Sequence, residues 1–313
     1  MTADASRPLL ALVGPTAVGK TALSLALAAR FDGEIVSADS RLFYRGLDIG
    51  TAKPTAAERA AAPHHLIDIC APDETLSLGQ YQRLARAAID GVLARGRLPI
   101  LAGGTGQYVM AVVEGWGVPE VAPQPALRAA LEGLGGAEAA RWLAALDPTA
   151  AGRIDPRNVR RVVRALEVTL VSGRPISELQ RKTPPPYDVR LVGLRRDRAA
   201  LYARIDARVD EMMAAGLLDE VRRLREAGYA DEPPLSGLGY RQLLAHLRGE
   251  TTLDEAITRI KFETHRFARQ QAIWFRANDP RIAWFEADDA TGVMAYIAGW
   301  LEAQGGGLTT ADR

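Results

Sequence analysis

The amino-acid sequence predicts an α/β fold in which a parallel sheet carries a helical insertion domain, and three observations lead to this prediction. Short apolar runs alternate with helical patterns over most of the 313 residues. Such alternation indicates parallel strands with helices covering both faces of the sheet. The segment GPTAVGKT, residues 14–21, separates the first apolar run from the first helical pattern. The alternation stops over residues 114–187, which begin and end in Pro-rich segments typical of domain boundaries.

Each expected element follows from a local pattern. The apolar runs predict strands at Leu9–Val13, Glu34–Ser37, Leu98–Ala102, Arg190–Leu194 and Ile282–Phe285. Helical spacing of apolar residues predicts helices at Thr21–Arg30, Leu78–Ala94, Ala126–Leu134, Ala137–Ala145, Pro156–Ser172, Ala199–Ala227, Tyr240–Leu247 and Leu253–Phe275. We therefore expect a core of residues 1–113 and 188–300, an insertion of residues 114–187, and a disordered tail of residues 301–313.

The composition excludes several classes of protein. Apolar residues make up 48% and charged residues 25% of the chain, as in ordinary soluble proteins. No apolar run approaches the length of a membrane span, and the N-terminus lacks the pattern of a signal peptide. The single cysteine, Cys70, excludes an internal disulfide and a cysteine-based zinc site. We expect a cytoplasmic monomer without a membrane segment; the net charge of +1 indicates no partner.

The segment GPTAVGKT fits the Walker A pattern of ATP- and other nucleotide-binding proteins, and its place between a strand and a helix makes the match specific. Its backbone N–H groups and the positive end of the following helix favour a polyphosphate. The lysine neutralises phosphate charge, and the hydroxyl of the last residue can bind Mg²⁺. The predicted diphosphate-binding residues are Gly14, Pro15, Thr16, Ala17, Val18, Gly19, Lys20 and Thr21. The pattern alone predicts a P-loop NTPase-like core but not the reaction.

Two further segments depart from an ordinary NTPase. After the strand at Leu98–Ala102, where a hydrolytic enzyme often has an acid, the chain has two glycines and Thr105. The glycines either permit close approach of another group or simply form a tight turn. The segment DSRLFYRGLDIGTAKP, residues 39–54, carries more polar side chains than a metal site needs. His64, His65 and Asp68 are too few and wrongly spaced for a metal site.

Several motifs, taken in order, resemble the tRNA dimethylallyltransferases, also called tRNA isopentenyltransferases. They are GPTAVGKT, SADSRLFYRGLDIGTAKP, HHLIDI, LAGGTGQY, RNVRRVVRALEV, ALYARIDARVDEMMAAGLLDEV and LGYRQL, and together they cover roughly residues 8–285. The resemblance implies transfer of a dimethylallyl group from dimethylallyl diphosphate to N6 of adenine 37, beside the tRNA anticodon. It also implies that diphosphate leaves, that Mg²⁺ assists, and that the partner is the tRNA anticodon stem-loop.

The resemblance also implies roles for residues outside the phosphate loop. Asp39 matches the family's proposed general base; a magnesium ligand or a loop cap is the alternative for this position. Ser40, Arg41 and Leu42 complete a segment that contacts the target nucleotide, although many relatives have Gln where this chain has Leu42. Thr105 matches a position near the diphosphate and the RNA. The predicted catalytic residues are Asp39, Thr105 and Arg198.

A run of arginines in the insertion predicts the RNA surface. Val159, Val162, Val163 and Leu166 form the apolar face of an expected helix capped by Asp155, with Pro156 at its first position. By itself the basic face could be solvated; the family counterpart contacts tRNA. The predicted tRNA-binding residues are Asp39, Ser40, Arg41, Leu42, Thr105, Arg128, Asn158, Val159, Arg160, Arg161 and Arg164.

Some features permit other interpretations. Arg198, Arg204 and Arg208 lie off the apolar stripe of their helix, and each could be solvated. Thr51 and Lys53 either shape the diphosphate pocket or form a structural turn. A small-molecule P-loop kinase and an adenine-nucleotide isopentenyltransferase both fit the phosphate loop, as does a nucleotide-switched RNA-binding protein. The resemblance implies a channel that prenyl diphosphate and a flipped adenine enter from opposite sides, so that they meet at Asp39.

Overall fold

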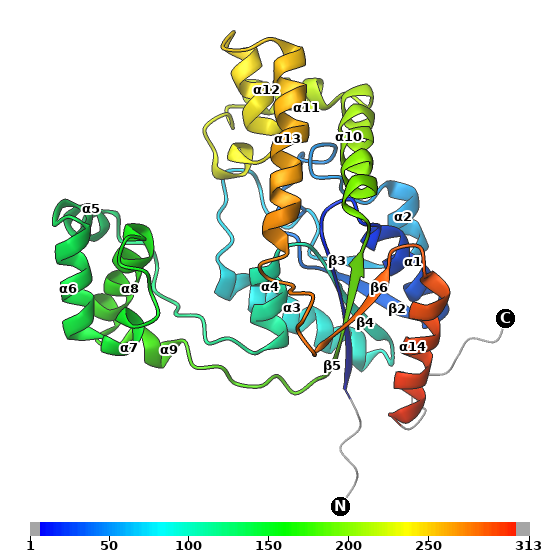
Figure 1. Ribbon diagram of the computed structural model, residues 1–313, viewed down its shortest axis with the longest axis horizontal. Coiled ribbons are helices and arrows are strands. Elements are labelled where there is room, and N and C mark those ends of the chain that lie inside the picture. The colour runs from blue at the N-terminus through cyan, green and yellow to red at the C-terminus, as the bar shows by residue number, and fades with distance from the viewer. Residues whose placement is uncertain (1–6, 305–313) are drawn as a thin grey trace, which may run out of the picture. The chain divides into compact units, whose positions relative to one another are not determined.

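A computed structural model describes residues 7–304. Its centre is a six-stranded, entirely parallel sheet with the strand order β3-β2-β4-β1-β5-β6, which confirms the predicted parallel α/β core (Figure 1). The strands are β1 (Pro8–Val13), β2 (Gly33–Ser37), β3 (His64–His65), β4 (Leu98–Ala102), β5 (Asp188–Arg195) and β6 (Ile282–Glu286). All five predicted strands are present. Two-residue β3 escaped prediction because a run that short has no periodicity.

The central strand, β1, determines where the site lies. All six of its residues are buried, because β4 and β5 flank it and helices cover both faces of the sheet. Residue Leu10 packs in one hydrophobic cluster and Leu9 in another, as the alternation of a strand requires. Parallel strands end at one edge of the sheet, so the segments after β1, β2 and β4 meet there.

The predicted core helices begin largely where the sequence predicts, and the core has three more. The core helices are α1 (Lys20–Arg30), α2 (Ala56–Ala61), α3 (Leu78–Ala94), α4 (Gly106–Val113), α10 (Arg198–Ala214), α11 (Leu217–Glu226), α12 (Tyr240–Leu247), α13 (Leu253–Gln271) and α14 (Ala290–Ala303), with a 3₁₀ turn at Pro233–Ser236. Of these, α2, α4 and α14 were not predicted. The predicted helix over 199–227 is two helices, because Gly216 adopts a left-handed conformation between them. The helix predicted to reach Phe275 ends at Gln271.

The chain divides into two compact units, one formed by Met1–Val113 and Pro186–Arg313 and the other by Glu114–Pro185. The second unit is helical, with its own apolar cluster around Leu143, Val163 and Leu166. Its helices are α5 (Pro125–Gly133), α6 (Gly136–Leu146), α7 (Pro148–Ala151), α8 (Val159–Ser172) and α9 (Ile176–Leu179). We refer to it as the insertion unit.

Two boundary predictions need correction. The helix α8 begins at Val159, not Pro156, because the Asn158 side chain accepts the Arg161 N–H and is the N-cap. The Asp155 carboxylate instead binds Arg157 in a local ion pair. The predicted tail starts too early, since α14 continues to Ala303; residues 305–313 lie outside the described residues. Among residues 7–304, no helix is long and apolar enough to span a membrane.

Candidate active site

Two cavities meet at the carboxyl edge of the sheet. The first, of about 430 Å³, is lined by the phosphate loop, the ends of β2 and β4, and one side of α10; we call it the phosphate-loop cavity. The second, of about 640 Å³, lies between the loops after β2 and β4 and helices α10, α12 and α13; we call it the adjoining cavity. Thr16, Asp39, Gly104, Arg208 and Gln271 line both. These residues therefore mark the passage between them.

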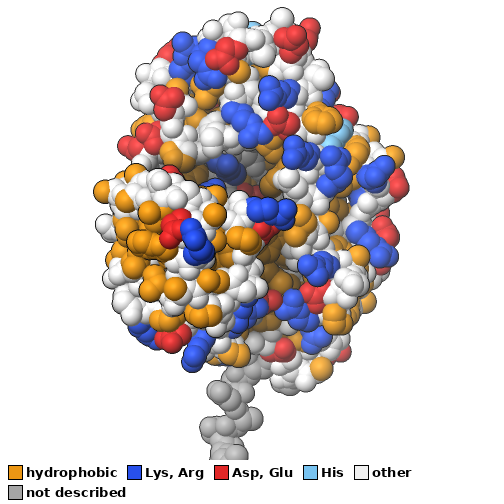
Figure 2. Space-filling view, turned by 60° about the vertical axis from the view of Figure 1, so that its left-hand side comes forward, with side chains coloured by type: hydrophobic (Ala, Val, Ile, Leu, Met, Phe, Trp, Pro, Cys, Tyr) orange, Lys and Arg blue, Asp and Glu red, His pale blue; other side chains and the backbone are white. Residues whose placement is uncertain are grey.

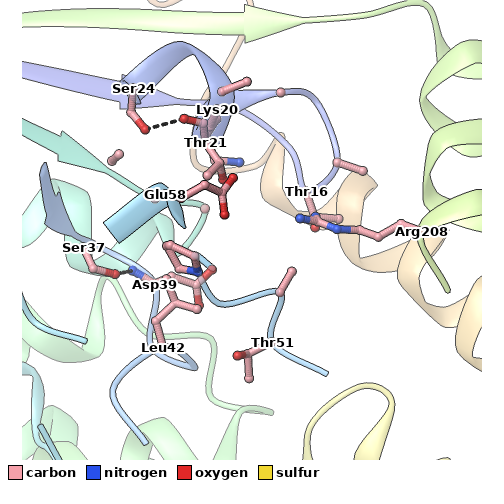
Figure 3. Close-up of a pocket in the computed structure, with 18 of the residues that line it drawn as sticks. Thr16, Lys20, Thr21, Ser24, Ser37, Asp39, Leu42, Thr51, Glu58 and Arg208 are labelled. Atoms are coloured by element: carbon pink, nitrogen blue, oxygen red, sulfur yellow. Dashed lines mark hydrogen bonds between the residues drawn. The ribbon is translucent and has the colours of Figure 1, made fainter. Parts of the chain in front are cut away.

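The phosphate loop turns from β1 into α1, so that Lys20 and Thr21 stand in the first turn of that helix (Figure 3). The Lys20 ammonium donates to the backbone carbonyls of Gly14 and Pro15, at 2.9 and 2.8 Å. Burial lowers the pKa of Lys20 to about 8, although the Asp39 charge opposes this shift. A buried cation whose hydrogen bonds go to neutral carbonyls is prepared to receive an anion.

Two arginines of α10 reach the phosphate loop. Arg204 Nε donates to the carbonyl of Ala17 at 3.0 Å and lines the phosphate-loop cavity. Arg208 extends toward Thr16 (Figure 3), and burial lowers the pKa of its guanidinium. Arg198, predicted to be catalytic, is exposed at the start of α10, lies over the ring of Tyr202, and lines neither cavity. Arg204 and Arg208 are thus the α10 cations at the cavity, and their spacing of four residues was the available sequence signal.

Asp39 lies directly after β2, in the passage between the cavities. Its Oδ1 accepts the N–H of Arg41 at 2.9 Å, which fixes the carboxylate at the start of a turn. No ion pair to Asp39 is found among the described residues, but its charge partly offsets the lowering of the Lys20 and Arg208 pKa values that burial causes. Asp39 is therefore a carboxylate near two cations. Its Oδ1 binds the Arg41 N–H, and its Oδ2 can accept a proton or bind a metal ion.

The other residues predicted from the segment after β2 are also close to this passage. Ser40 N donates to Thr105 Oγ1 at 3.2 Å, which joins the loop after β2 to the loop after β4. Leu42 lines the phosphate-loop cavity, whereas Ser40, Arg41 and Thr105 line the adjoining cavity. Arg41 also donates to the carbonyl of Pro234 at 3.0 Å. The structure thus brings together five predicted residues from two separate segments of the sequence.

In the turn around GTAKP, Lys53 has a structural role, whereas Thr51 lines the cavities. The Lys53 ammonium is buried between the carboxylates of Asp48 and Asp68, at 2.6 and 2.5 Å, and lines neither cavity. Thr51 lines both. The carboxylate of Glu220, on α11, accepts the backbone N–H groups of residues 48–50 at 2.8 to 3.1 Å and the Tyr240 hydroxyl at 2.7 Å. Glu220 was not predicted, and it holds the loop that carries Thr51.

Gln271 is a second residue that sequence reasoning missed. Its side chain is buried at the end of α13, where Oε1 accepts the Thr16 N–H at 2.8 Å and Nε2 donates to the Gly104 carbonyl at 2.9 Å. It therefore joins the phosphate loop to the loop after β4. Arg266 and Gln270 on the same helix, and Trp274 just after it, line the adjoining cavity.

The predicted RNA-binding arginines of the insertion unit fall into two groups. Arg128 and Arg164 bind the fully buried carboxylate of Glu167, at 2.9 and 2.5 Å, so both serve the packing of this unit. The Glu167 pKa is lowered to about 2: burial opposes the shift, and these ion pairs outweigh it. Arg160 and Arg161 are exposed. Figure 2 shows basic side chains scattered among acidic ones on the face that it presents. The exposed pair is thus the better candidate for phosphate contacts.

The fold and site together define an α/β protein with a phosphate loop and a second cavity joined to it. The described residues contain no cluster of three metal-binding side chains, and glycine stands where a hydrolytic enzyme has its acid after β4. The glycine after β4 distinguishes the site from that of an ordinary nucleotide hydrolase.

Comparison with known proteins identifies the family. Residues 42–278 match the IPP transferase family. A tRNA dimethylallyltransferase of Roseiflexus sp. (strain RS-1) is 61% identical over 274 residues, which are 86% of this chain and 90% of that protein. The tRNA isopentenylpyrophosphate transferase of Bacillus halodurans superposes with a TM-score of 0.73 at 40% identity, over 96% of this chain and 98% of that one. A eukaryotic dimethylallyltransferase acting on tRNA gives a TM-score of 0.81 at 26% identity, over 98% and 86% of the two chains. This chain belongs to the IPP transferase family.

Proposed function

We propose that this protein transfers the dimethylallyl group of dimethylallyl diphosphate to N6 of adenine 37 in tRNA and releases diphosphate. The observation that carries the proposal is the position of Asp39 in the passage between the phosphate-loop cavity and the adjoining cavity. A diphosphate in the first cavity and an adenine in the second would meet at this carboxylate. An adenine can enter only if it leaves the stack of the anticodon loop, as in other enzymes that modify bases.

The residues of the phosphate-loop cavity fit an allylic diphosphate. Lys20, Arg204 and Arg208 supply positive charge around the phosphate loop. When the bond between the allylic carbon and the diphosphate oxygen breaks, negative charge builds on the leaving group, and these cations stabilise it. Preorganised charge of this kind acts on the transition state more strongly than on the ground state. The cavity therefore favours departure of diphosphate.

Asp39 then has the role of general base. The N6 amine of adenine is a weak nucleophile, because its lone pair is delocalised into the ring. As the new carbon–nitrogen bond forms, the proton on N6 passes to the Asp39 carboxylate, whose geometry the Arg41 N–H fixes. A positioned base of this kind accelerates proton transfer by about 10²- to 10⁴-fold. Thr105 and Ser40 hold the two loops that border the adenine.

The residues also fit a magnesium ion. Mg²⁺ prefers oxygen ligands and commonly uses one protein oxygen together with substrate phosphates and water. The Thr21 hydroxyl, at the start of α1 in the phosphate-loop cavity, is such an oxygen. Bound there with the diphosphate, the ion would neutralise part of the leaving group's charge.

For the RNA, we propose that the insertion unit contacts the anticodon stem-loop through Arg160 and Arg161. Both are exposed at the start of α8, and their side chains can approach phosphates without breaking the Glu167 cluster. Phosphate contacts of this kind orient RNA without reading its sequence. Asn158 and Val159, beside them, belong to the same surface. Action as a monomer in the cytoplasm is part of this proposal.

One experiment tests the reaction directly. The protein is incubated with unmodified tRNA and dimethylallyl diphosphate labelled in the prenyl group, the RNA is digested, and the labelled nucleoside is identified. We expect label on N6-(dimethylallyl)adenosine and release of one diphosphate per transfer. Label in free adenine nucleotide instead of tRNA would favour the adenine-nucleotide isopentenyltransferase. ADP formation from ATP without prenyl transfer would favour a small-molecule kinase.

A further inference from the structure

The side chain of Gln271 binds the phosphate loop at the amide of Thr16. Thr16 is the third residue of GPTAVGKT, and its N–H is already bound by Gln271 Oε1 at 2.8 Å. The other end of the same amide donates to the Gly104 carbonyl at 2.9 Å, so both polar atoms are satisfied. With only 5% of the residue exposed, this is a built part of the site and not a mobile side chain.

Glycine at position 104 leaves room for this arrangement. A Cβ atom at Gly104 would lie 2.4 Å from Gln271 Nε2 and 3.7 Å from Lys20 Nζ, so a larger residue would force the glutamine away. Gly103 is equally restricted, because its Cβ would lie 2.2 Å from the Ala38 carbonyl oxygen. The loop after β4 thus brings its backbone close to the phosphate loop, and a neutral amide fills the space between them.

This arrangement bears on which polyphosphate the loop can hold. In phosphate loops, successive backbone N–H groups surround the phosphates, and the lysine reaches the outer ones. The later amides surround the inner phosphates, and the hydroxyl of the last motif residue binds Mg²⁺. The earlier loop residues therefore lie nearest the terminal phosphate of a triphosphate. Here the donor of Thr16 is taken, and the buried Gln271 side chain occupies the position next to it.

We propose that Gln271 is a specificity-determining residue that restricts the phosphate loop to diphosphates by occupying the place of a third phosphate. This inference rests on the proposed function, in which the loop holds a prenyl diphosphate. It explains how a Walker A loop avoids competition from nucleoside triphosphates, which would otherwise bind the same lysine and helix end. The relevant ligand property is the number of linked phosphates, independent of any prenyl or nucleoside group.

Binding of inorganic pyrophosphate and inorganic tripolyphosphate, measured by calorimetry at one fixed free Mg²⁺ concentration, tests the proposal. The variants are Gln271→Ala, which removes the side chain beyond Cβ, and Gln271→Asn, which is too short to span Thr16 and Gly104. Gln82→Ala is the matched control, because Gln82 is also a buried glutamine but bonds to Ala111, away from both cavities. Thermal melting checks that each variant is folded.

We expect the unchanged protein and Gln82→Ala to bind pyrophosphate at least about tenfold more tightly than tripolyphosphate. Each Gln271 variant should raise the tripolyphosphate-to-pyrophosphate affinity ratio by about tenfold, the effect of one restored hydrogen bond to a charged group. An unchanged ratio in the folded Gln271 variants, with pyrophosphate still bound, would overturn this inference alone. Failure of the unchanged protein to bind pyrophosphate would instead contradict the proposed function.

Discussion

Replacing Asp39 with asparagine separates its proposed role as a base from a role as a metal ligand. The asparagine side chain keeps an oxygen that can accept the Arg41 N–H, a bond of 2.9 Å to Asp39, so the local turn should persist while basicity is lost. We expect the rate of prenyl transfer to fall by about 10²- to 10⁴-fold. Burial lowers the pKa of Lys20, and the charge of Asp39 offsets part of that shift. Removing this charge takes a repulsion away from the diphosphate but also favours the neutral form of Lys20. Because these two effects oppose each other, diphosphate affinity should change little.

Single-turnover transfer, combined with separate titrations of diphosphate and tRNA at several magnesium concentrations, measures these quantities. Both dissociation constants should change by less than about tenfold, or about 1.4 kcal/mol. Asp210→Asn is the control, because Asp210 pairs with Lys261 on the surface and lines neither cavity. If Asp39 instead holds the metal, diphosphate binding weakens and added magnesium restores it. That result would refute the assignment as base, and undiminished transfer would refute both roles.

Three further perturbations follow from the site. The protonated form of Lys20 binds the anion, and the Lys20 pKa is about 8. Diphosphate affinity should therefore be full below pH 8 and fall about tenfold per pH unit above it. Titration calorimetry from acidic to alkaline pH measures this dependence, and a constant affinity would contradict it. Glu220→Ala leaves three amide N–H groups and the Tyr240 hydroxyl without their acceptor. Urea denaturation should therefore show that the free energy of unfolding falls by at least about 3 kcal/mol. A fall below about 1 kcal/mol would mean that water replaces the carboxylate. Arg160→Ala combined with Arg161→Ala should lower the magnitude of the slope of log binding constant against log salt concentration for tRNA by about two units, with diphosphate affinity unchanged. An unchanged slope in filter binding would mean that these two arginines contact solvent and not RNA.

Local pattern was enough for the core and for much of the site. The runs that form β1, β2 and β4 are apolar because both faces of the sheet are covered, and the phosphate loop follows β1 without a gap. Parallel strands end at one edge, so a residue just after β2 must lie at the same edge of the sheet as that loop. The sequence therefore determined the edge at which Asp39 lies, whereas the strand order, with β4 between β2 and β1, set its distance from the loop.

Periodicity was less reliable for the arginines. It correctly separated the apolar face of α8 from its charged face, but it could not distinguish a solvated arginine from one bound to a buried acid. Arg164 and Arg128 share Glu167, and Arg128 lies 39 residues before that carboxylate in the chain. Only folding of the insertion unit brings the three together.

The contacts that complete the site were decided by tertiary structure alone. Gln271 lies 255 residues from Thr16, and Glu220 lies 170 residues from Gly50, yet each side chain binds the backbone of the distant loop. Backbone N–H and C=O groups are the same at every residue, so the sequence carries no signal that marks them as partners. The sequence determined the phosphate loop and the edge of the sheet at which the carboxylate lies, because each follows a parallel strand closely in the chain. The packing of α11 and α13 decided how the loops that line the cavities are held, and how much space remains between those loops.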